Sequence, residues 1–537
     1  MFPLFFCPSA VLQPGRSRQP EEQYNFLELF FRLEYHSNLK NNTCMRDQMA
    51  NHLIGRDSEI STLRQILTSD KPEFLALYGR RRIGKTFLIR SFFETQAVFF
   101  FNVTGTKNGA LREQIKHFTK QLSVVFYHQA PLENKKTWDD TLEMLTHAIQ
   151  RAPQDKKIVL FLDELPWLAT KNARFLQTLE YYWNQHWSRD ARIKLIVCGS
   201  SASWIIKKII NNKGGLHNRV THTMRLQPFN LHYTKQYLFA QGVTLNDRQI
   251  LQLYMVTGGI PYYLSRIEKG LSASQIIEKL AFTNDSFLLK EFDNLFSSLF
   301  DEPTTYVTIL RLIAKHPYGI NQEHLLGQLD SALQGQGGID KLTALEDAGF
   351  IMGLKTHLHK RRGKYYRLTD EYTLFYLDWI EPIRQTLQAH ALTSGNWQEM
   401  QNTPAWNTWL GYAFESVCYK HIAQIRKKLA ISPTAIANSW RYVPQKQHSE
   451  CGAQIDLLFD RKDDSITLCE IKYSTEPFVI DKAYAKNLIN KKETFVKNTR
   501  TKKQIFMAMI TTEGIKDNLY ADELINAVVI LPDLFQE

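Results

Sequence analysis

The sequence predicts a multidomain α/β protein, and three observations support this fold class. First, 537 residues with 44% hydrophobic and 22% charged residues form an ordinary globular chain, long enough for about three or four domains. Second, an apolar strand at 74–78 leads into a glycine-containing loop and then a helix. Third, charged residues lie on two apolar strands, 453–459 and 466–473, near the end of the chain. We therefore expect two α/β units with helical segments between them.

The loop after the first strand fits the P-loop pattern without a mismatch. Gly79 is followed by four residues and then by Gly84, Lys85 and Thr86. Glycines let backbone N–H groups turn toward a phosphate, and the helix N-terminus adds partial positive charge. We expect Lys85 to reach the outer phosphates of ATP and the Thr86 hydroxyl to hold Mg²⁺. The predicted nucleotide-binding residues here are Gly79, Arg80, Arg81, Arg82, Ile83, Gly84, Lys85 and Thr86.

An acidic pair follows a second apolar strand. The unbroken run at 158–162 predicts a parallel strand covered on both faces, and Asp163 and Glu164 end it. In a nucleotide site, Asp163 would bind Mg²⁺ through water, and Glu164 would orient or deprotonate the attacking water. An acidic pair some 80 residues after a P-loop favours this catalytic interpretation.

Other candidates for the nucleotide site rest on weaker patterns. Ser200 follows the strand at 194–198 and would sense the γ-phosphate, or it is a simple turn serine. Arg219 follows a Gly-rich loop and is favoured over Arg225 as an arginine that approaches a phosphate from the lid or a neighbouring subunit; a surface role is the alternative. Gly55 and Arg56 precede an amphipathic helix that lies beside the adenine or only packs on the core.

From about Leu53 to Ser265 the chain resembles the prokaryotic "archaeal ATPase" group of AAA+-related signal-transduction ATPases. The resemblance rests on the stretches LIGRDSEI, LYGRRRIGKT, LFLDELPWL, VCGSSASW and TGGIPYYL. It implies an ATP-driven switch with slow hydrolysis, whose output is carried by attached domains. It also implies that Pro261, in a Gly-x-Pro element, lies where the lid contacts the nucleotide.

The segment from residue 303 has short helices and then a basic hairpin. Three helices and a β-wing predict a winged helix. Positive charge on the wing suits DNA phosphates, but contact with protein or intramolecular regulation is an equal alternative. The aromatic helix after it, at 371–383, is predicted to be core. The basic wing residues are Lys355, Lys360, Arg361, Arg362, Lys364 and Arg367.

Four charged residues of the last domain fall on elements in a meaningful order. Glu415 lies in a predicted helix, Asp456 on one strand, and Glu470 and Lys472 on the next, where alternation points both to one face. The pattern resembles the PD-(D/E)xK restriction-endonuclease-like core, and the C-terminal part resembles the DUF234-type domain that follows such ATPases. The resemblance implies that Asp456 and Glu470 ligate metal, Lys472 assists the nucleophile and Glu415 completes the site. A fold that has lost nuclease activity is the alternative.

A basic stretch follows the four residues. Residues 482–503 hold eight Lys or Arg against one acidic residue, Glu493, and would cover a phosphate backbone or form a solvated helix face. The predicted domains are an N-terminal extension at 1–50, a P-loop ATPase core at 51–230, a helical lid at 231–300, a winged helix at 301–390 and a nuclease-like domain at 395–537.

Composition limits the classes of partner. A net charge of +12 and a pI near 9.1 suit nucleic acid, or describe a solvated basic surface. Six cysteines without CxxC pairs argue against a zinc cluster and for a reducing cytoplasm. No apolar run reaches the roughly 18 to 20 residues that cross a bilayer. The apolar start is a poor signal peptide, and we interpret residues before about 48 as a flexible arm or an upstream extension of the reading frame.

Two functions remain open from the sequence. One is an ATPase, with ATP and Mg²⁺ as cofactors, that couples nucleotide state to DNA binding or Mg²⁺-dependent DNA cleavage, alone or as a homo-oligomer. The other is a non-catalytic, ATP-dependent regulator or scaffold whose C-terminal domain only binds nucleic acid or protein. The four residues Glu415, Asp456, Glu470 and Lys472 discriminate between them.

Overall fold

The computed structural model describes residues 53–170, 173–212, 214–216, 218–354, 364–389, 396–442, 444 and 452–537. Contacts divide the chain into Met1–His52 and Leu53–Glu537, and all described residues belong to the second unit. The predicted extension at 1–50 and the wing residues Lys355, Lys360, Arg361 and Arg362 lie outside the described residues.

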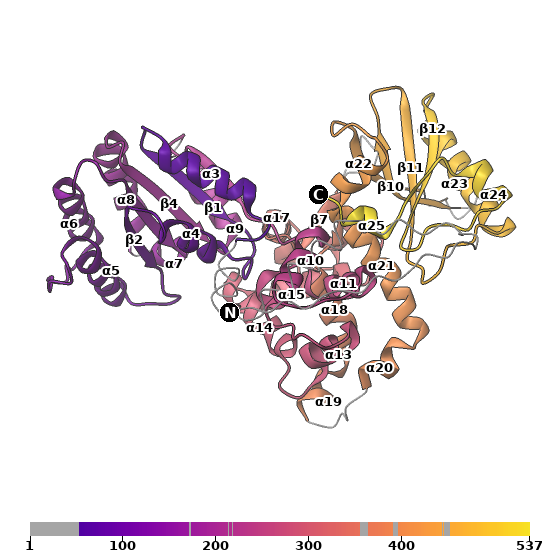
Figure 1. Ribbon diagram of the computed structural model, residues 1–537, viewed down its shortest axis with the longest axis horizontal. Helices are drawn as coiled ribbons and strands as arrows, with labels where there is room; N and C mark the ends of the chain where they lie inside the picture. The colour runs from indigo at the N-terminus through magenta and orange to yellow at the C-terminus, as the bar shows by residue number, and fades with distance from the viewer. Residues whose placement is uncertain are drawn as a thin grey trace, which may run out of the picture. The chain divides into compact units, whose positions relative to one another are not determined.

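The first sheet is parallel and has the order β2-β3-β4-β1-β5 (Figure 1). Its strands are β1 (Glu73–Tyr78), β2 (Phe99–Thr104), β3 (Ile158–Asp163), β4 (Ile193–Gly199) and β5 (His222–Arg225). β4 lies between β1 and β3, so the tips of the P-loop strand and of the acidic strand are one strand apart. Ligands of open parallel sheets bind at such carboxyl ends. The predicted α/β fold with a parallel core is confirmed.

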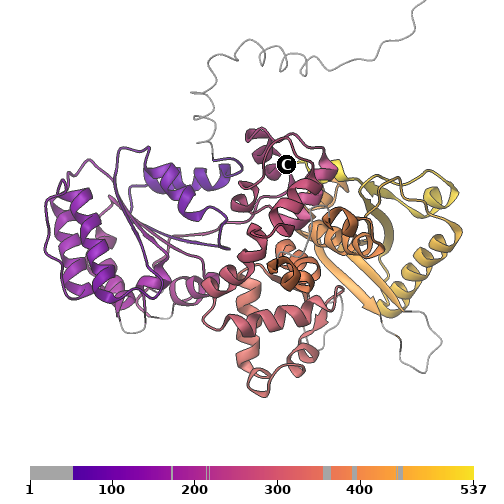
Figure 2. The ribbon, with the colours of Figure 1, turned by 90° about the horizontal axis from the view of Figure 1, so that it is seen from below.

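Helices cover both faces of this sheet (Figures 1 and 2). Alternate residues of β1 point to opposite faces, so each face has its own apolar side chains to pack against helices. Leu75 and Leu77 belong to the core cluster that contains α3 and α4, and Phe74 and Ala76 to the cluster that contains α5, α6 and α8. The helical elements are α3 (Asp57–Thr68), α4 (Lys85–Phe93), α5 (Leu111–Phe126), α6 (Trp138–Arg151), α7 (Leu165–Leu168), α8 (Phe175–Gln185), η1 (Trp187–Arg189), α9 (Ala202–Ile205) and η2 (Ile206–Ile210).

A run of helices follows the first sheet, as the predicted lid requires. They are α10 (Leu231–Ala240), α11 (Asp247–Thr257), α12 (Pro261–Leu264), α13 (Ala273–Ile277), η3 (Glu278–Phe282) and α14 (Phe287–Leu299). Gly258 and Gly259, between α11 and α12, have φ of +65° and +64°, and a Cβ on Gly259 would lie 2.1 Å from the Phe229 carbonyl oxygen. Glycine is therefore needed at the turn between α11 and α12, and the assignment of these helices to a lid stays a prediction.

The middle segment contains three helices and a small antiparallel sheet of order β6-β8-β7. Its elements are α15 (Pro303–Ala314), β6 (Ile320–Asn321), α16 (Gln322–Gly327), η4 (Ser331–Leu333), α17 (Gln336–Asp347), β7 (Ile351–Leu354) and β8 (Tyr365–Leu368). The winged-helix interpretation of this segment stays a prediction. The aromatic segment after it is core as predicted, since Tyr372, Phe375 and Tyr376 are fully buried. That segment continues through α18 (Glu371–Phe375), η5 (Tyr376–Ile380), η6 (Glu381–Ile383), α19 (Arg384–Gln388) and α20 (Asn396–Gln401).

The last sheet is mixed and has the order β13-β12-β11-β10-β9. β9 (Ile436–Tyr442), β10 (Ala453–Asp460) and β11 (Ser465–Lys472) are antiparallel, and β12 (Gln504–Thr511) and β13 (Ala527–Val529) continue parallel to β11. The helices around it are α21 (Pro404–Lys420), α22 (Ile422–Lys428), α23 (Lys482–Thr499), α24 (Leu519–Leu524) and α25 (Leu531–Leu534). The hairpin of β10 and β11 is as predicted, and the nuclease-like fold stays a prediction. None of the helices in the described ranges has the length and hydropathy of a membrane span.

Candidate functional sites

The P-loop connects β1 to α4 through backbone that only glycine adopts easily. Gly79 has φ of +146°, and a Cβ there would lie 2.4 Å from the Leu226 carbonyl oxygen. Gly84, with φ of +88°, is the residue before α4, which begins at Lys85. Both glycines of the motif are thus required by local geometry, and the predicted strand–loop–helix arrangement is present.

Lys85 and Thr86 meet the polar groups expected of a nucleotide site. The Lys85 ammonium is buried and donates to the carbonyl oxygens of Gly79 and Arg80, at 2.9 Å each. The Thr86 hydroxyl donates to Oδ2 of Asp163 at 2.8 Å, which joins the P-loop to the end of β3. A hydroxyl and a carboxylate side by side are hard oxygen ligands, so Thr86 and Asp163 fit Mg²⁺ bound with ATP.

Ser200 holds the second carboxylate of the acidic pair. Its backbone N–H donates to Oε2 of Glu164 at 3.1 Å, and its hydroxyl donates to the other carboxylate oxygen. Glu164 itself has a left-handed backbone, with φ of +46°. The contact follows from the sheet order, because β4 ends beside β3. The sequence suggested a γ-phosphate sensor or a turn serine at Ser200, and neither interpretation included a hydrogen bond to Glu164.

Arg82 leaves the P-loop toward the lid. Its Nη2 donates to Oε2 of Glu291 at 2.7 Å, and the Tyr263 hydroxyl donates to Oε1 of the same carboxylate at 3.0 Å. The guanidinium also lies 4.2 Å from the centre of the Tyr262 ring. Burial lowers the pKa of Arg82, but the Glu291 carboxylate outweighs this effect and the net pKa is raised. Arg82 therefore fastens the P-loop to α12 and α14.

Arg80 leaves the loop in another direction, toward the residue before α18. Its guanidinium is buried, ion-paired with Asp370, and stacked 4.9 Å from the Phe350 ring centre. Asp370 also caps α18, since its Oδ2 accepts from the Thr373 N–H at 2.9 Å. The P-loop is thus joined to a segment almost 300 residues further along the chain.

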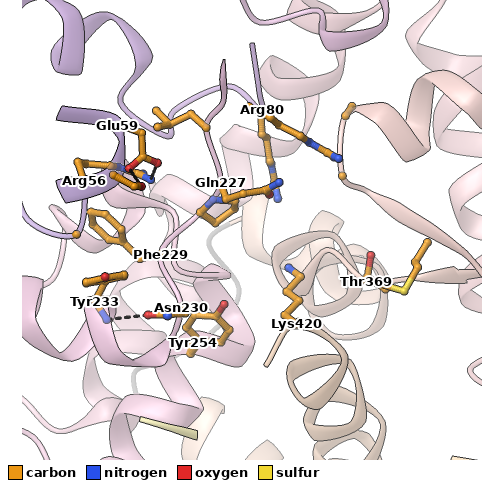
Figure 3. Close-up of a pocket in the computed structure, with 18 of the residues that line it drawn as sticks. Arg56, Glu59, Arg80, Gln227, Phe229, Asn230, Tyr233, Tyr254, Thr369 and Lys420 are labelled. Carbon is orange, nitrogen blue, oxygen red and sulfur yellow. Dashed lines mark hydrogen bonds and ion pairs between the residues drawn. The ribbon is translucent and has the colours of Figure 1, made fainter. Parts of the chain in front are cut away.

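A cavity of about 700 Å³ lies beside Arg80 (Figure 3). Arg80 and Lys420 enter it from opposite sides, and Tyr233 also lines it. Arg56 lines the same cavity, where Nη2 donates to the Ile83 carbonyl at 3.3 Å and the guanidinium stacks 4.8 Å from the Phe229 ring centre. Arg56 thereby supports the back of the P-loop.

The remaining candidates for the nucleotide site are Arg81, Arg219, Arg225 and Pro261. Arg219 is exposed, and Arg81 is half-buried. Arg225 donates from Nη2 to the Asp347 carbonyl at 3.2 Å, so its contact is with α17. Pro261 is the first residue of α12, and the N–H of the next residue, Tyr262, donates to the Arg82 carbonyl at 3.4 Å. Pro261 therefore lies where lid and P-loop touch.

A second polar cluster lies at the hairpin of the last sheet. Leu457 pairs with Cys469, which brings Asp456 of β10 opposite Glu470 of β11. Both carboxylates are buried, and Oδ2 of Asp456 accepts from the Ile471 N–H at 3.1 Å. Burial, and then the charges of Glu470 and Glu415, raise the pKa of Asp456 to about 7.

Glu470 is surrounded by donors. Lys491 of α23 donates to both its oxygens, at 2.8 and 2.6 Å, and the Tyr484 hydroxyl donates to Oε1 at 2.9 Å. Lys472 lies 3.1 Å from Oε1 and on the same face of β11, as the alternation predicted. Burial raises the pKa of Glu470, but Lys491 and Lys472 outweigh it, so the net pKa is lowered.

Glu415 is paired with a residue that the sequence assigned elsewhere. Nη1 of Arg367 donates to Oε2 of Glu415 at 2.7 Å, and Arg367 is only 5% exposed. The prediction that Arg367 adds positive charge to the surface of the wing is therefore wrong, because β8 turns its side chain into the interior. Lys364, the other described wing residue, pairs with Glu346 at 3.0 Å. The predicted wing contacts now depend on the four residues outside the described ranges.

The hairpin cluster has the oxygen donors that a divalent cation prefers, but they are already paired. Within the residues that the structure describes, no group of three or more His, Cys, Asp or Glu side chains is arranged to hold a metal ion. Both Glu470 oxygens accept from ammonium or hydroxyl groups, and Glu415 accepts from Arg367. Asp456 and Glu470 would thus hold Mg²⁺ only after these contacts rearrange.

Lys491 and Tyr484 were missed by sequence reasoning, which treated their helix as a basic stretch. A usable signal was present. Tyr484, Leu488, Lys491 and Phe495 are spaced as one helix face, and Leu488 and Phe495 are buried. A lysine on an apolar stripe predicts a buried acidic partner, because an unpaired ammonium is costly there.

Part of the chain matches a known domain family, and longer parts are similar to individual proteins. Residues 53–267 match the family model of an ATPase domain predominantly from Archaea. The uncharacterized protein MJECL04 of Methanocaldococcus jannaschii is 27% identical over 430 residues, which cover 78% of this chain and 87% of that protein. Among solved structures, the Walker-type ATPase PABY2304 of Pyrococcus abyssi is 16% identical with a TM-score of 0.43, covering 60% of this chain and 96% of that one.

The structure of the ORC2 protein of Aeropyrum pernix, in complexes with ADPNP and ADP, is also 16% identical to this chain, with a TM-score of 0.38. The match covers 63% of this chain and 96% of that one. The match to the archaeal ATPase domain supports nucleotide binding and ATPase activity by residues 53–267.

Proposed function

We propose that this chain is an ATPase whose nucleotide state controls a C-terminal site that binds nucleic acid and cleaves it with a divalent cation. The observation that carries the proposal is the P-loop itself, with Lys85 and Thr86 beside Asp163 in a segment that matches an ATPase domain. The C-terminal half of the proposal rests on Asp456, Glu470 and Lys472, which converge on one hairpin.

At the P-loop, each side chain has a role that follows from its position. Lys85 would exchange its two carbonyl partners for the outer phosphates of ATP, and Thr86 and Asp163 would hold Mg²⁺. Bound Mg²⁺ supplies charge neutralisation at the phosphate oxygens. Glu164 would orient the attacking water once Ser200 releases its carboxylate. Arg219, which is exposed, is suited to act on the nucleotide of a neighbouring subunit.

At the C-terminal site, the substrate class follows from charge. Exposed lysines of α23, among them Lys482, Lys486 and Lys492, lie on the helix whose inner face contacts Glu470, and suit a polyanionic backbone. Asp456 and Glu470 would hold a divalent cation, which supplies a nucleophile from water. Lys472 lies beside Glu470 and would stabilise negative charge as a phosphodiester is attacked. A winged helix at 301–390, with its basic wing, would add a DNA contact.

Coupling between the two sites would pass through buried ion pairs. Arg80 of the P-loop pairs with Asp370, and Arg367, three residues earlier, pairs with Glu415. A nucleotide that moves Arg80 therefore acts on the segment that also positions Glu415. Removing one partner of such a pair costs about 3 to 5 kcal/mol because the other charge is left buried and unpaired, so a nucleotide that displaced Arg80 would favour rearrangement around Asp370.

A second candidate function is favoured by the pairing of Glu470. Because Lys491, Lys472 and Tyr484 already surround this carboxylate, a regulator or scaffold that binds nucleic acid without cleaving it also fits.

Two variants separate these functions. Asp456→Ala should abolish cleavage of plasmid and binding of Mn²⁺, whereas Lys472→Ala should abolish cleavage and largely keep Mn²⁺, because an ammonium does not ligate metal. ATP hydrolysis should continue in both variants, since the P-loop lies in another domain. Cleavage by Asp456→Ala at the parent rate would contradict the site; a parent protein that binds DNA but cuts none under any metal or nucleotide condition would favour the scaffold.

A further inference from the structure

Lys491 contacts the carboxylate of Glu470, which must be free if the hairpin is to bind a divalent cation. It reaches from the middle of α23 to both oxygens of Glu470, and its side chain is 15% exposed. We propose that Lys491 is a regulatory lysine, which blocks divalent-cation binding at Glu470 until a polyanionic strand along α23 draws it away. The inference rests on the proposed function of the hairpin as a metal site, and adds how that site is kept empty of metal without substrate.

Charge balance supports a blocking role. The cluster holds three carboxylates, on Asp456, Glu470 and Glu415, and three cationic groups, on Lys472, Lys491 and Arg367. A divalent cation added to this set would meet three positive neighbours and leave excess positive charge in a buried place. Loss of one monovalent cation halves that excess positive charge. Arg367 is a poorer candidate to leave because it is only 5% exposed. The departure of Lys472, whose side chain is 34% exposed, would still leave Oε2 of Glu470 covered by Lys491.

The contacts of Glu470 also show that Lys491 is not needed to pair it. Lys472 lies 3.1 Å from Oε1, and the Tyr484 hydroxyl donates to the same atom at 2.9 Å. If Lys491 left, Glu470 would therefore keep one ammonium and one hydroxyl partner, both at Oε1. Lys491 adds a second ammonium and is the group that covers Oε2, the oxygen that neither of the others contacts.

The position of Lys491 on α23 gives a way to move it. Lys492 is its exposed neighbour, and Lys486 is exposed on the preceding part of the same helix. A nucleic-acid strand held by these lysines would bring phosphates near the end of the long Lys491 side chain, which then exchanges Glu470 for a phosphate. Metal and nucleic acid would therefore bind with positive cooperativity, each raising the affinity for the other.

The test measures Mn²⁺ affinity of the full chain without nucleotide, by electron paramagnetic resonance of free Mn²⁺. Lys491→Met should bind Mn²⁺ at least about tenfold more tightly than the parent, the size typical of changes next to metal ligands. Lys516→Met, the same change at an exposed lysine of the same domain outside α23, should leave the affinity unchanged. Adding Asp456→Ala to Lys491→Met should remove the gain, which assigns it to the hairpin and not to the P-loop.

Lys491→Gln guards against a folding defect, because it keeps a donor for Glu470 while removing the charge; it should also bind Mn²⁺ more tightly. An oligonucleotide should raise the Mn²⁺ affinity of the parent but not of Lys491→Met. Parent-like or weaker Mn²⁺ binding by both Lys491 variants would overturn the proposal, and an oligonucleotide without effect on the parent would overturn its substrate-coupled part. Tighter Mn²⁺ binding without any DNA cleavage would uphold the regulatory lysine and refute only the nuclease.

Discussion

Lys85 is the residue on which nucleotide binding should depend most. Its ammonium is buried and, among the residues that the structure describes, donates to two carbonyl oxygens of its own loop, which the phosphates of ATP would replace. Lys85→Ala should therefore abolish tight ATP binding in calorimetry. Arg90→Ala, an exposed change on the same helix, should bind ATP like the parent. Parent-like affinity of Lys85→Ala would refute the P-loop assignment.

Glu164 should affect hydrolysis and not binding. Its carboxylate accepts hydrogen bonds from Ser200 after β4, whereas the Lys85 ammonium donates to carbonyl oxygens of the P-loop. Glu164→Gln keeps the size and the acceptor oxygen but removes the charge that activates water. ATP affinity should stay within about twofold of the parent while phosphate release falls by at least about 100-fold. A Glu164→Gln protein that hydrolyses ATP at the parent rate would assign the reaction to another base.

Side-chain partners were the least predictable feature at this scale. Gly79, Gly84, Lys85 and Thr86 were identified because one continuous motif contains them. Lys491 and Arg367 were not, because each pairs with a carboxylate that is distant in sequence, and a lysine in a basic stretch looks the same whether it faces water or Glu470. Only the apolar stripe of α23 distinguished Lys491 from its exposed neighbours.

At the scale of elements, His421 joins the lid to the C-terminal domain. Nε2 of its ring accepts from the Leu231 N–H at the start of α10, at 2.9 Å, and Nδ1 bonds to the Val417 carbonyl at 2.7 Å. The ring is fully buried, and burial lowers the pKa of His421 from 6.5 to about 4. The neutral ring, with Nδ1 as donor, is therefore the form that bridges α10 and α21.

This arrangement predicts how stability depends on pH. The unfolded chain binds a proton at His421 below pH 6.5, whereas the folded chain does so only near pH 4, so the contribution is present above pH 6.5 and is lost as the pH falls toward 4. The loss amounts to about 3 kcal/mol for one fully buried group. Urea-unfolding midpoints between pH 7.5 and 4.5 should fall less steeply in His421→Gln than in the parent. His147→Gln, at an exposed histidine, should keep the parent slope, and equal slopes in all three proteins would contradict the account.

Most elements were predictable, because their periodicity is local. Buried strands such as β3 appear as unbroken apolar runs, and the hairpin of β10 and β11 appears as alternating charged and apolar residues around a turn. Which element lies beside which was less predictable. The position of β4 between β1 and β3 decides that Ser200 meets Glu164, and it depends on packing of the whole sheet.

At the scale of the whole described unit, buried ion pairs link the P-loop to the last domain. Arg80 pairs with Asp370, Lys420 of α21 pairs with Glu371, and Arg367 pairs with Glu415 of the same helix. All three carboxylates are at least nine-tenths buried. Removing one partner of such a pair destabilises the fold much more than replacing both partners, so a displacement of Arg80 would leave Asp370 as an unpaired buried charge.

The central claim is that nucleotide at the P-loop controls the C-terminal site. The most direct measurement is the rate of plasmid cleavage by the full chain with Mg²⁺, with and without ATP, for the parent, Lys85→Ala and Asp456→Ala. The account predicts that ATP changes the cleavage rate of the parent and has no effect on the cleavage rate of Lys85→Ala. Asp456→Ala should cleave no plasmid with or without ATP, but should still hydrolyse ATP. Cleavage that responds to ATP equally in the parent and Lys85→Ala, or no cleavage of nucleic acid under any condition, would contradict it.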